Sequence, residues 1–164
     1  MCEPAILERT GLSVAAHQYR TVANYLELRR RGPFIPVLQG WTLADYERCV
    51  ELYASAGIDL FRVPLVGLGS VCRRHTAEIA RIACELAMVH GLRVHGFGVK
   101  ASGLRWYGRY LASADSLAWS YQARRYPPLR DCSHASCVNC PRYALRWRES
   151  VLHITAQLEL GELQ

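Results

Sequence analysis

One pattern recurs along residues 34–120: a short apolar run, a turn containing polar residues or glycine, and a stretch with helical apolar spacing. Short apolar runs bounded by turn residues predict buried strands, and apolar residues at i, i+3 and i+4 predict helices. The strands are expected at 34–38, 58–65, 92–97 and 115–120. The helices between them are expected at 42–57, 74–90 and 102–112.

This alternation of strands and helices is typical of an α/β protein with a parallel sheet, because parallel strands need helical crossovers between them. Four successive units suit either half of a (β/α)8 barrel or a small doubly wound sheet. The first 30 residues and the segment from 141 to about 160 have apolar spacings that predict further helices.

In both parallel architectures, ligands bind at the carboxyl ends of the strands. Glycine or a side chain that can form hydrogen bonds is present at each expected strand end. These ends are 39–41, 67–70, 96–100 and the region 115–120. We therefore expect any catalytic or binding residues of the sheet to come from these four segments.

Four possible metal ligands occur within nine residues: Cys132, His134, Cys137 and Cys140. Zinc prefers four nitrogen or sulfur ligands in a tetrahedron, and short spacings allow one loop to supply them. His134 lies inside this loop and His153 lies in the following helix, so either histidine can be the fourth ligand. Four ligands with no open position predict a structural zinc ion. We expect two units: the βα units over 1–125, which the half-barrel alternative makes a partial βα barrel, and a zinc-binding knuckle with its helix over 126–164.

The net charge of +6 comes almost entirely from arginine, which accounts for 19 of the 20 basic residues. Arginine holds phosphate oxygens with two parallel hydrogen bonds and stacks on bases, so a nucleic acid is a candidate partner. The arginines near the cysteines are interleaved with Tyr126, Tyr143 and Trp147. The residues predicted to bind nucleic acid are Arg124, Arg125, Arg142 and Arg146. The alternative is that these arginines form an ordinary solvated helix face.

Seven cysteines are an odd number, which does not suit a secreted disulfide framework. The sequence has no apolar run long enough for a transmembrane helix, and its first residues do not resemble a signal peptide. We therefore expect a cytoplasmic protein without a membrane partner.

Five segments resemble the tRNA-guanine transglycosylase superfamily, and most closely its DNA-directed branch, the 7-deazaguanine transglycosylases of the DpdA family. These segments are PVLQGW (36–41), VGLGSVCRR (66–74), HGFGVK (95–100), SADSLAWS (113–120) and CSHASCVNCPRYALRW (132–147). The resemblance implies a (β/α)8 barrel with a zinc knuckle. It also implies exchange of guanine for a 7-deazaguanine base such as 7-cyano-7-deazaguanine, with DNA as the substrate and tRNA as the alternative.

The resemblance also implies roles for individual residues. Asp115 matches the carboxylate that attacks the anomeric carbon of the sugar. Gln39 and Gly40 match the pair that reads the edge of the base, and the backbone of Gly67, Leu68 and Gly69 matches a turn that contacts it. Without the resemblance, Asp115 is equally a capping residue, Gln39 a solvated strand end, and the glycines a tight turn.

In the zinc knuckle, His134 stands in the place of a family cysteine, and Cys140 stands in for a later histidine. A family segment with a second catalytic aspartate has no match in the chain. Four strands do not close an eight-stranded barrel.

We therefore expect the C-terminal half of such an enzyme, a truncated or split chain that is inactive unless a second chain supplies the other half. The competing interpretations are a non-catalytic, zinc-containing fragment that binds nucleic acid and an unrelated α/β protein with a structural zinc.

Overall fold

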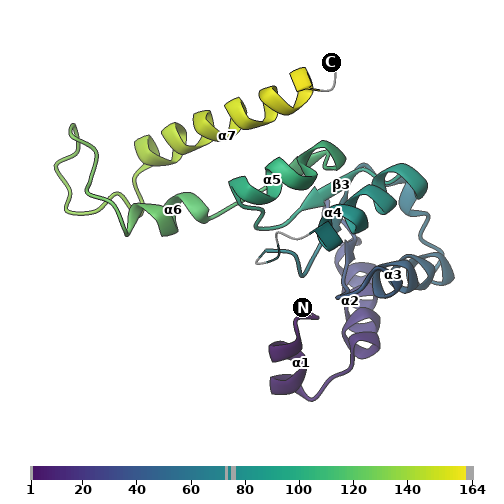
Figure 1. The fold of residues 1–164 in the computed structure, drawn as a ribbon. Helices are drawn as coiled ribbons and strands as arrows, with labels where there is room; N and C mark the ends of the chain where they lie inside the picture. The colour runs from purple at the N-terminus through teal and green to yellow at the C-terminus, as the bar shows by residue number, and fades with distance from the viewer. Residues whose placement is uncertain (1, 73, 75–76, 162–164) are drawn as a thin grey trace.

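The computed structural model describes residues 2–72, 74 and 77–161 and shows a mixed α/β fold (Figure 1). The strands are β1 (Val37–Leu38), β2 (Val66–Leu68), β3 (Val94–Gly96) and β4 (Ser113–Ala114). The α-helices are α1 (Pro4–Thr10), α2 (Val14–Leu28), α3 (Leu43–Ser55), α4 (Ala77–Cys84), α5 (Ala101–Tyr107), α6 (Ala118–Ala123) and α7 (Pro141–Gly161). The short elements are the 3-10 helices η1 (Leu60–Arg62) and η3 (Gly108–Tyr110) and the π-helix η2 (Glu85–Val89).

The four strands form one parallel sheet in the order β1-β2-β3-β4. Val37 pairs with Gly67, Gly67 with His95, and His95 with Ser113, so these four residues form one row across the sheet. Successive residues of a strand point to opposite faces. The row therefore lies on the face opposite to Leu38 and Leu68. The predicted α/β fold with a parallel sheet is confirmed.

The core lies between the sheet and the helices α3, α4 and α5. The face of the sheet that these helices cover carries four side chains that are almost completely buried: Leu38, Val66, Leu68 and Val94. They join one apolar cluster with helix residues that include Tyr46, Tyr53, Ile79, Ile82 and Tyr107. The helix α7 runs beside α5 and α6 at the end of the molecule far from α1 (Figure 1), and its Val151 packs against the same cluster.

The second strand was expected at 58–65, and this prediction is wrong. The strand begins at Val66, and Leu60–Arg62 is a 3-10 turn. The side chain of Asp59 accepts a hydrogen bond from the backbone N–H of Phe61 at 3.0 Å, and this bond turns the chain before it can extend. Gly67 and Leu68 consequently lie in the strand and not in the turn that the sequence suggested.

The fourth strand was expected at 115–120, and this prediction is also wrong. The strand is Ser113–Ala114, and Ala118–Ala123 is a helix. The hydroxyl of Ser116 accepts a hydrogen bond from the backbone N–H of Ala118 at 3.2 Å and helps the chain turn into α6. Asp115 therefore comes directly after β4, at the carboxyl end of the strand.

The helices correspond more closely to the sequence patterns. Thr42 and Asp45 form the capping box that starts α3, and α7 begins at Pro141 as expected. The helix expected at 74–90 is α4 followed by the π-helix η2, and residues 75 and 76 lie outside the described part of the chain. In the part of the chain that the structure describes, no helix has the length and hydropathy required to cross a membrane.

Candidate strand-end site and metal centre

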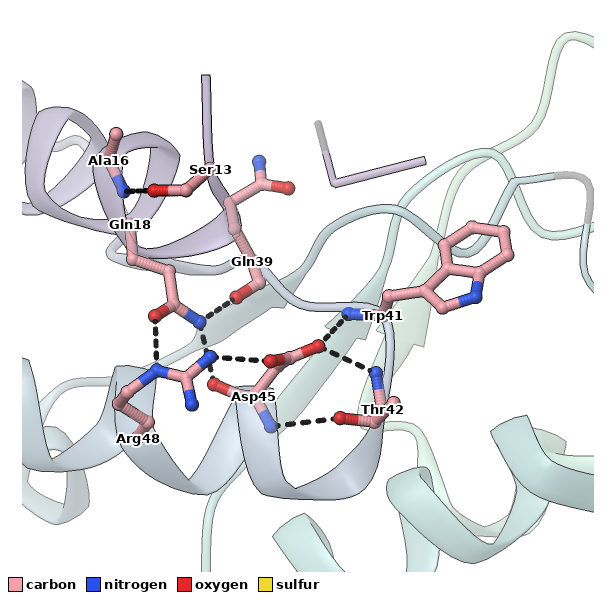
Figure 2. Close-up of polar contacts among 8 residues, drawn as sticks. All are labelled: Ser13, Ala16, Gln18, Gln39, Trp41, Thr42, Asp45 and Arg48. Carbon is pink, nitrogen blue, oxygen red and sulfur yellow. Dashed lines mark hydrogen bonds and ion pairs between the residues drawn. The ribbon is translucent and has the colours of Figure 1, made fainter. Parts of the chain in front are cut away.

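A buried glutamine fixes the end of β1 (Figure 2). Gln18 on α2 is completely buried, and its Nε2 donates to the backbone oxygens of Gln39 at 2.7 Å and of Asp45 at 2.6 Å. Its Oε1 accepts a hydrogen bond from Nε of Arg48 at 3.2 Å. The side chain of Gln18 therefore joins α2 to the end of β1 and to the start of α3.

The turn after Gln39 is held by the carboxylate of Asp45. This carboxylate accepts hydrogen bonds from the backbone N–H groups of Trp41 at 3.0 Å and Thr42 at 2.9 Å, and it pairs with Arg48 (Figure 2). Burial raises the pKa of Asp45, but these N–H donors and the Arg48 guanidinium outweigh burial, and the net pKa is lowered. Asp45 therefore remains an anion that keeps this turn in one shape.

The side chain of Gln39 lies against Gly69 at the end of β2. A Cβ atom on Gly69 would come within 2.8 Å of the Gln39 amide nitrogen Nε2, so only glycine leaves room for this contact. The hydroxyl of Ser70 donates to Oε1 of Gln39 at 2.8 Å. The hydroxyl of Tyr46 donates to the carbonyl oxygen of Gly69 at 2.8 Å, and burial raises the pKa of Tyr46, which keeps that proton in place. The structure thus brings Gln39 and Gly69 together.

The other predicted glycines are sites of close packing. A Cβ on Gly67 would lie 2.4 Å from the ring of Phe97, and a Cβ on Gly40 would lie 2.9 Å from Cβ of Asp45. Leu68 is completely buried, and its side chain belongs to the core face of the sheet. Gly40 and Gly67 are therefore required for close packing, and the side chain of Leu68 belongs to the core.

Asp115 follows β4 at the same edge of the sheet. Its Oδ1 accepts a hydrogen bond from the backbone N–H of Gly98 at 2.6 Å, and 62% of its side chain is exposed to solvent. The same Oδ1 lies 3.9 Å from Nε2 of His95, and Nδ1 of His95 lies 2.8 Å from the hydroxyl of Ser113. Asp115 is therefore oriented by the backbone and remains accessible from outside.

Trp41 and Arg74 form a second contact at this edge of the sheet. The Arg74 guanidinium lies 4.0 Å from the centroid of the Trp41 ring, and it pairs with Glu78 at 2.7 Å. Arg74 is only 9% exposed, and within the described residues its buried Nη1 has no hydrogen-bond partner. A cation on an indole face holds the ring in place, so Trp41 is supported from one side.

The four predicted metal ligands come together in the loop before α7. The ligand atoms of Cys132, His134, Cys137 and Cys140 all lie within 4.8 Å of one another. The Sγ atoms of Cys132 and Cys140 are 3.8 Å apart, and Nε2 of His134 lies 3.2 Å from Sγ of Cys137. A tetrahedral zinc ion with bonds of about 2.3 Å to sulfur separates two sulfur ligands by about 3.8 Å. The donor set and this spacing fit such an ion.

The surroundings of the cluster favour metal binding. Cys137 and Cys140 are buried against Ala123 of α6, with Leu129 and Tyr143 packed around them. The backbone N–H of Tyr143 at the start of α7 lowers the pKa of the Cys140 thiol, whereas burial and the neighbouring thiols raise the pKa of Cys132 to about 11. The thiolate, which is the form that binds metal, therefore forms most easily at Cys140. His153 is exposed on α7 and is not part of the cluster, so the structure favours His134 as the fourth ligand.

A second group of possible ligands consists of Glu47 on α3 with Glu85 and His90 at the two ends of the π-helix. Its ligand atoms also lie within 4.8 Å of one another, and all three residues are half-buried. No sequence pattern indicated this group, because its members are far apart along the chain. It has carboxylate and imidazole ligands and no thiol, a set that suits several divalent cations, zinc included.

A groove beside the metal cluster is lined by arginine and aromatic side chains. Its lining includes Tyr126, Arg130, Arg142, Arg146 and Trp147. Arg142 is tied to the loop because it donates to the backbone oxygen of Asp131 at 2.8 Å. The other two predicted arginines follow α6 outside this lining: Arg124 is exposed, and the guanidinium of Arg125 lies 4.4 Å from the centroid of the Tyr121 ring. The structure thus separates the four predicted arginines into two pairs.

Four residues to which the sequence patterns assigned no individual role contribute to this region: Gln18, Ser70, Arg74 and His95. Only Gln18 carries a signal in the sequence, because it stands four residues before the buried Val22 on the same helix face. A polar residue at such a position requires buried hydrogen-bond partners. The other three are identified only by their neighbours in space.

The fold and the two sites define a class of protein: a parallel α/β chain with polar strand ends and a loop of three cysteines and one histidine in metal-binding geometry. The model of the DpdA family, described as DeoxyPurine in DNA protein A, matches residues 1–161, and the chain belongs to this family. Searches of curated proteins and of solved structures found no match. Membership of the DpdA family supports a role in DNA modification.

Proposed function

We propose that this protein takes part in replacing guanine in DNA with a 7-deazaguanine base, such as 7-cyano-7-deazaguanine, by base exchange. The observation that carries the proposal is the position of Asp115. It is an accessible carboxylate directly after β4, at the sheet edge where Gln39 follows β1. Catalytic residues of parallel α/β enzymes lie at this edge.

In this mechanism Asp115 is the nucleophile. One carboxylate oxygen attacks the anomeric carbon of the deoxyribose, and guanine leaves while a glycosyl ester forms. The incoming base then attacks the same carbon and releases the carboxylate. The N–H of Gly98 donates to Oδ1 at 2.6 Å and therefore orients the carboxylate before the reaction.

Gln39 and the glycines around it supply base recognition. The hydroxyl of Ser70 orients the Gln39 amide, and the contact with Gly69 confines it. A guanine or 7-deazaguanine edge presents a carbonyl acceptor and amide donors, which a fixed amide can match. By resemblance to the family, the backbone of Gly40 and of residues 67–69 is the proposed contact for the flat base.

The metal centre has a structural role in this proposal, and zinc is the ion that its ligands suit best. Cys132, His134, Cys137 and Cys140 would hold it, and a closed set of four ligands fastens the loop to the start of α7. Arg142 and Arg146 in the lining of the adjacent groove are the proposed contacts to the DNA backbone, and Arg124 and Arg125, which follow α6, are proposed to contact phosphates outside the groove. Single-stranded or flipped-out DNA suits the aromatic residues of the groove, and tRNA is the alternative substrate.

The four strands would form part of a (β/α)8 barrel. The order β1-β2-β3-β4, with a crossover between successive neighbours, is the order found in such barrels. The face that carries Val37, Gly67, His95 and Ser113 would then point into the barrel. A second chain that pairs with the edge strands is a candidate partner, because it would cover this face and complete the base pocket.

A genetic test examines the protein together with any partner. The chromosomal gene is replaced by variants, and 7-deazaguanine nucleosides in digested genomic DNA are measured by mass spectrometry. Asp115→Asn should lower them to the level of a deletion strain, since asparagine keeps the shape but cannot form the ester. Asp59→Asn is the matched control, because Asp59 is similarly exposed (57%) and also accepts one backbone N–H.

Asp59→Asn should leave the modification at the wild-type level. If a deletion strain keeps its modified bases, the protein has no part in the exchange. If Asp115→Asn keeps wild-type levels while deletion abolishes them, Asp115 is not the nucleophile.

A further inference from the structure

The strand-end site contains a histidine that the mechanism above does not use. His95 lies in the middle of β3, and its side chain is only 16% exposed. Its Nε2 is 3.9 Å from Oδ1 of Asp115, and its Nδ1 is 2.8 Å from the hydroxyl of Ser113. The ring of Phe97 packs edge-on against the imidazole, with the ring centroids 4.8 Å apart. One imidazole nitrogen is therefore tied to the sheet, and the other faces the carboxylate.

Base exchange requires a proton that a nucleophilic carboxylate does not supply. Guanine is a poor leaving group as an anion and leaves readily when a ring nitrogen or its carbonyl oxygen is protonated. The incoming base carries a proton on the nitrogen that forms the new bond, and it has to lose that proton. The two half-reactions therefore need one group that gives a proton and later takes one back.

We propose that His95 is this proton carrier, an inference that rests on the proposed base exchange. In the first half-reaction the bond between guanine and the anomeric carbon breaks, the ester to Asp115 forms, and the Nε2 proton of His95 passes to guanine. In the second, the incoming base gives its proton to Nε2 of His95, bonds to the anomeric carbon and displaces Asp115. The histidine and the aspartate both return to their starting states, so protons and electron pairs balance.

The neighbours of His95 suit this role. When the Ser113 hydroxyl accepts a hydrogen bond from Nδ1–H, Nδ1 keeps its proton and Nε2 becomes the nitrogen that exchanges. Gly67 leaves room for the Phe97 ring, which fixes the plane of the imidazole. Ser113 is thus a positioning residue for His95.

The test compares two leaving bases. 7-Methylguanine in DNA is already a cation and leaves as a neutral molecule without a proton, whereas guanine needs one. The protein is tagged at its own gene, purified with its natural partners, and incubated with DNA oligonucleotides that contain either base. The covalent protein–DNA ester is then quantified on denaturing gels for wild type, His95→Gln, Ser113→Ala and Asp115→Asn.

His95→Gln should form the ester with guanine at least about 100-fold more slowly, and with 7-methylguanine within about twofold of the wild-type rate. Ser113→Ala should show a smaller loss confined to guanine, and Asp115→Asn should form no ester with either base. Equal loss on both bases in His95→Gln would show that His95 only positions Asp115 or stabilises the sheet, and would overturn the inference. A wild-type rate on guanine in His95→Gln would also overturn it and would leave Asp115 as the nucleophile. If the wild-type protein forms no ester with either base, the base exchange itself is wrong, and the role of His95 falls with it.

Discussion

Replacing Gln18 with leucine tests how the end of β1 is held. Leucine is close in size to glutamine and keeps the site filled, but it removes every hydrogen bond of the buried amide. The carbonyl oxygens of Gln39 and Asp45 lose donors at 2.7 and 2.6 Å, and Nε of Arg48 loses its acceptor at 3.2 Å. The substitution therefore changes polarity without leaving a cavity.

The three losses are unequal. A buried carbonyl left without a donor costs about 1–3 kcal/mol, and the carbonyl of Gln39 bears this cost. The carbonyl of Asp45 keeps its place in the hydrogen-bond ladder of α3, so the loss there is about 1 kcal/mol. Arg48 has 44% of its side chain exposed, and water replaces its lost acceptor. The free energy of unfolding should fall by about 2–4 kcal/mol, and Tm by about 6–12 °C in a chain of this length.

Urea unfolding followed by circular dichroism measures this change. The midpoint should fall and the slope m should stay constant, because the surface exposed on unfolding is the same. Arg48→Met is the control: it removes the hydrogen bond to Gln18 and the ion pair with Asp45 but keeps the donors to the carbonyls of Gln39 and Asp45, and it should cost less stability than Gln18→Leu. If Gln18→Leu lowers the free energy of unfolding by less than about 0.5 kcal/mol, which is less than a typical single hydrogen bond contributes, the amide of Gln18 does not hold the strand end.

Three further predictions address the metal, the groove and Gly69. Purified protein should contain about one zinc ion per chain, and Cys137→Ser should lose the ion and lower Tm; freely titratable thiols with no zinc would contradict this. Neutralising Arg142 and Arg146 together should weaken DNA binding and reduce its salt dependence more than neutralising the arginines at 29 and 30. Equal losses of affinity would show that the groove is not the DNA-binding surface. Gly69→Ala should displace the flexible Gln39 amide and abolish DNA modification, at a cost of less than about 1 kcal/mol in the free energy of unfolding. Unchanged modification would show that the contact between Gln39 and Gly69 has no part in recognition.

The sequence predicted the elements better than their boundaries. The parallel sheet, the capped helix α3 and the start of α7 at Pro141 follow from patterns that extend over many residues. The strands have only two or three residues, which is too short for a period to show. Single side chains therefore decided where they lie: Asp59 turned one apolar run into η1, and Ser116 helped turn another into α6.

Within the site, the sequence by itself determined what depends on neighbours along the chain. The spacing from Cys132 to Cys140 brings four ligands together in one loop, because a few residues of backbone set their distance. Only the tertiary structure decided which side chains meet across the sheet. Gln18 reaches the end of β1 from 21 residues away, and His95 reaches Ser113 from 18 residues away. These contacts depend on strand register and helix packing, which no local pattern specifies, because a shift of one residue moves every side chain to the other face of the sheet.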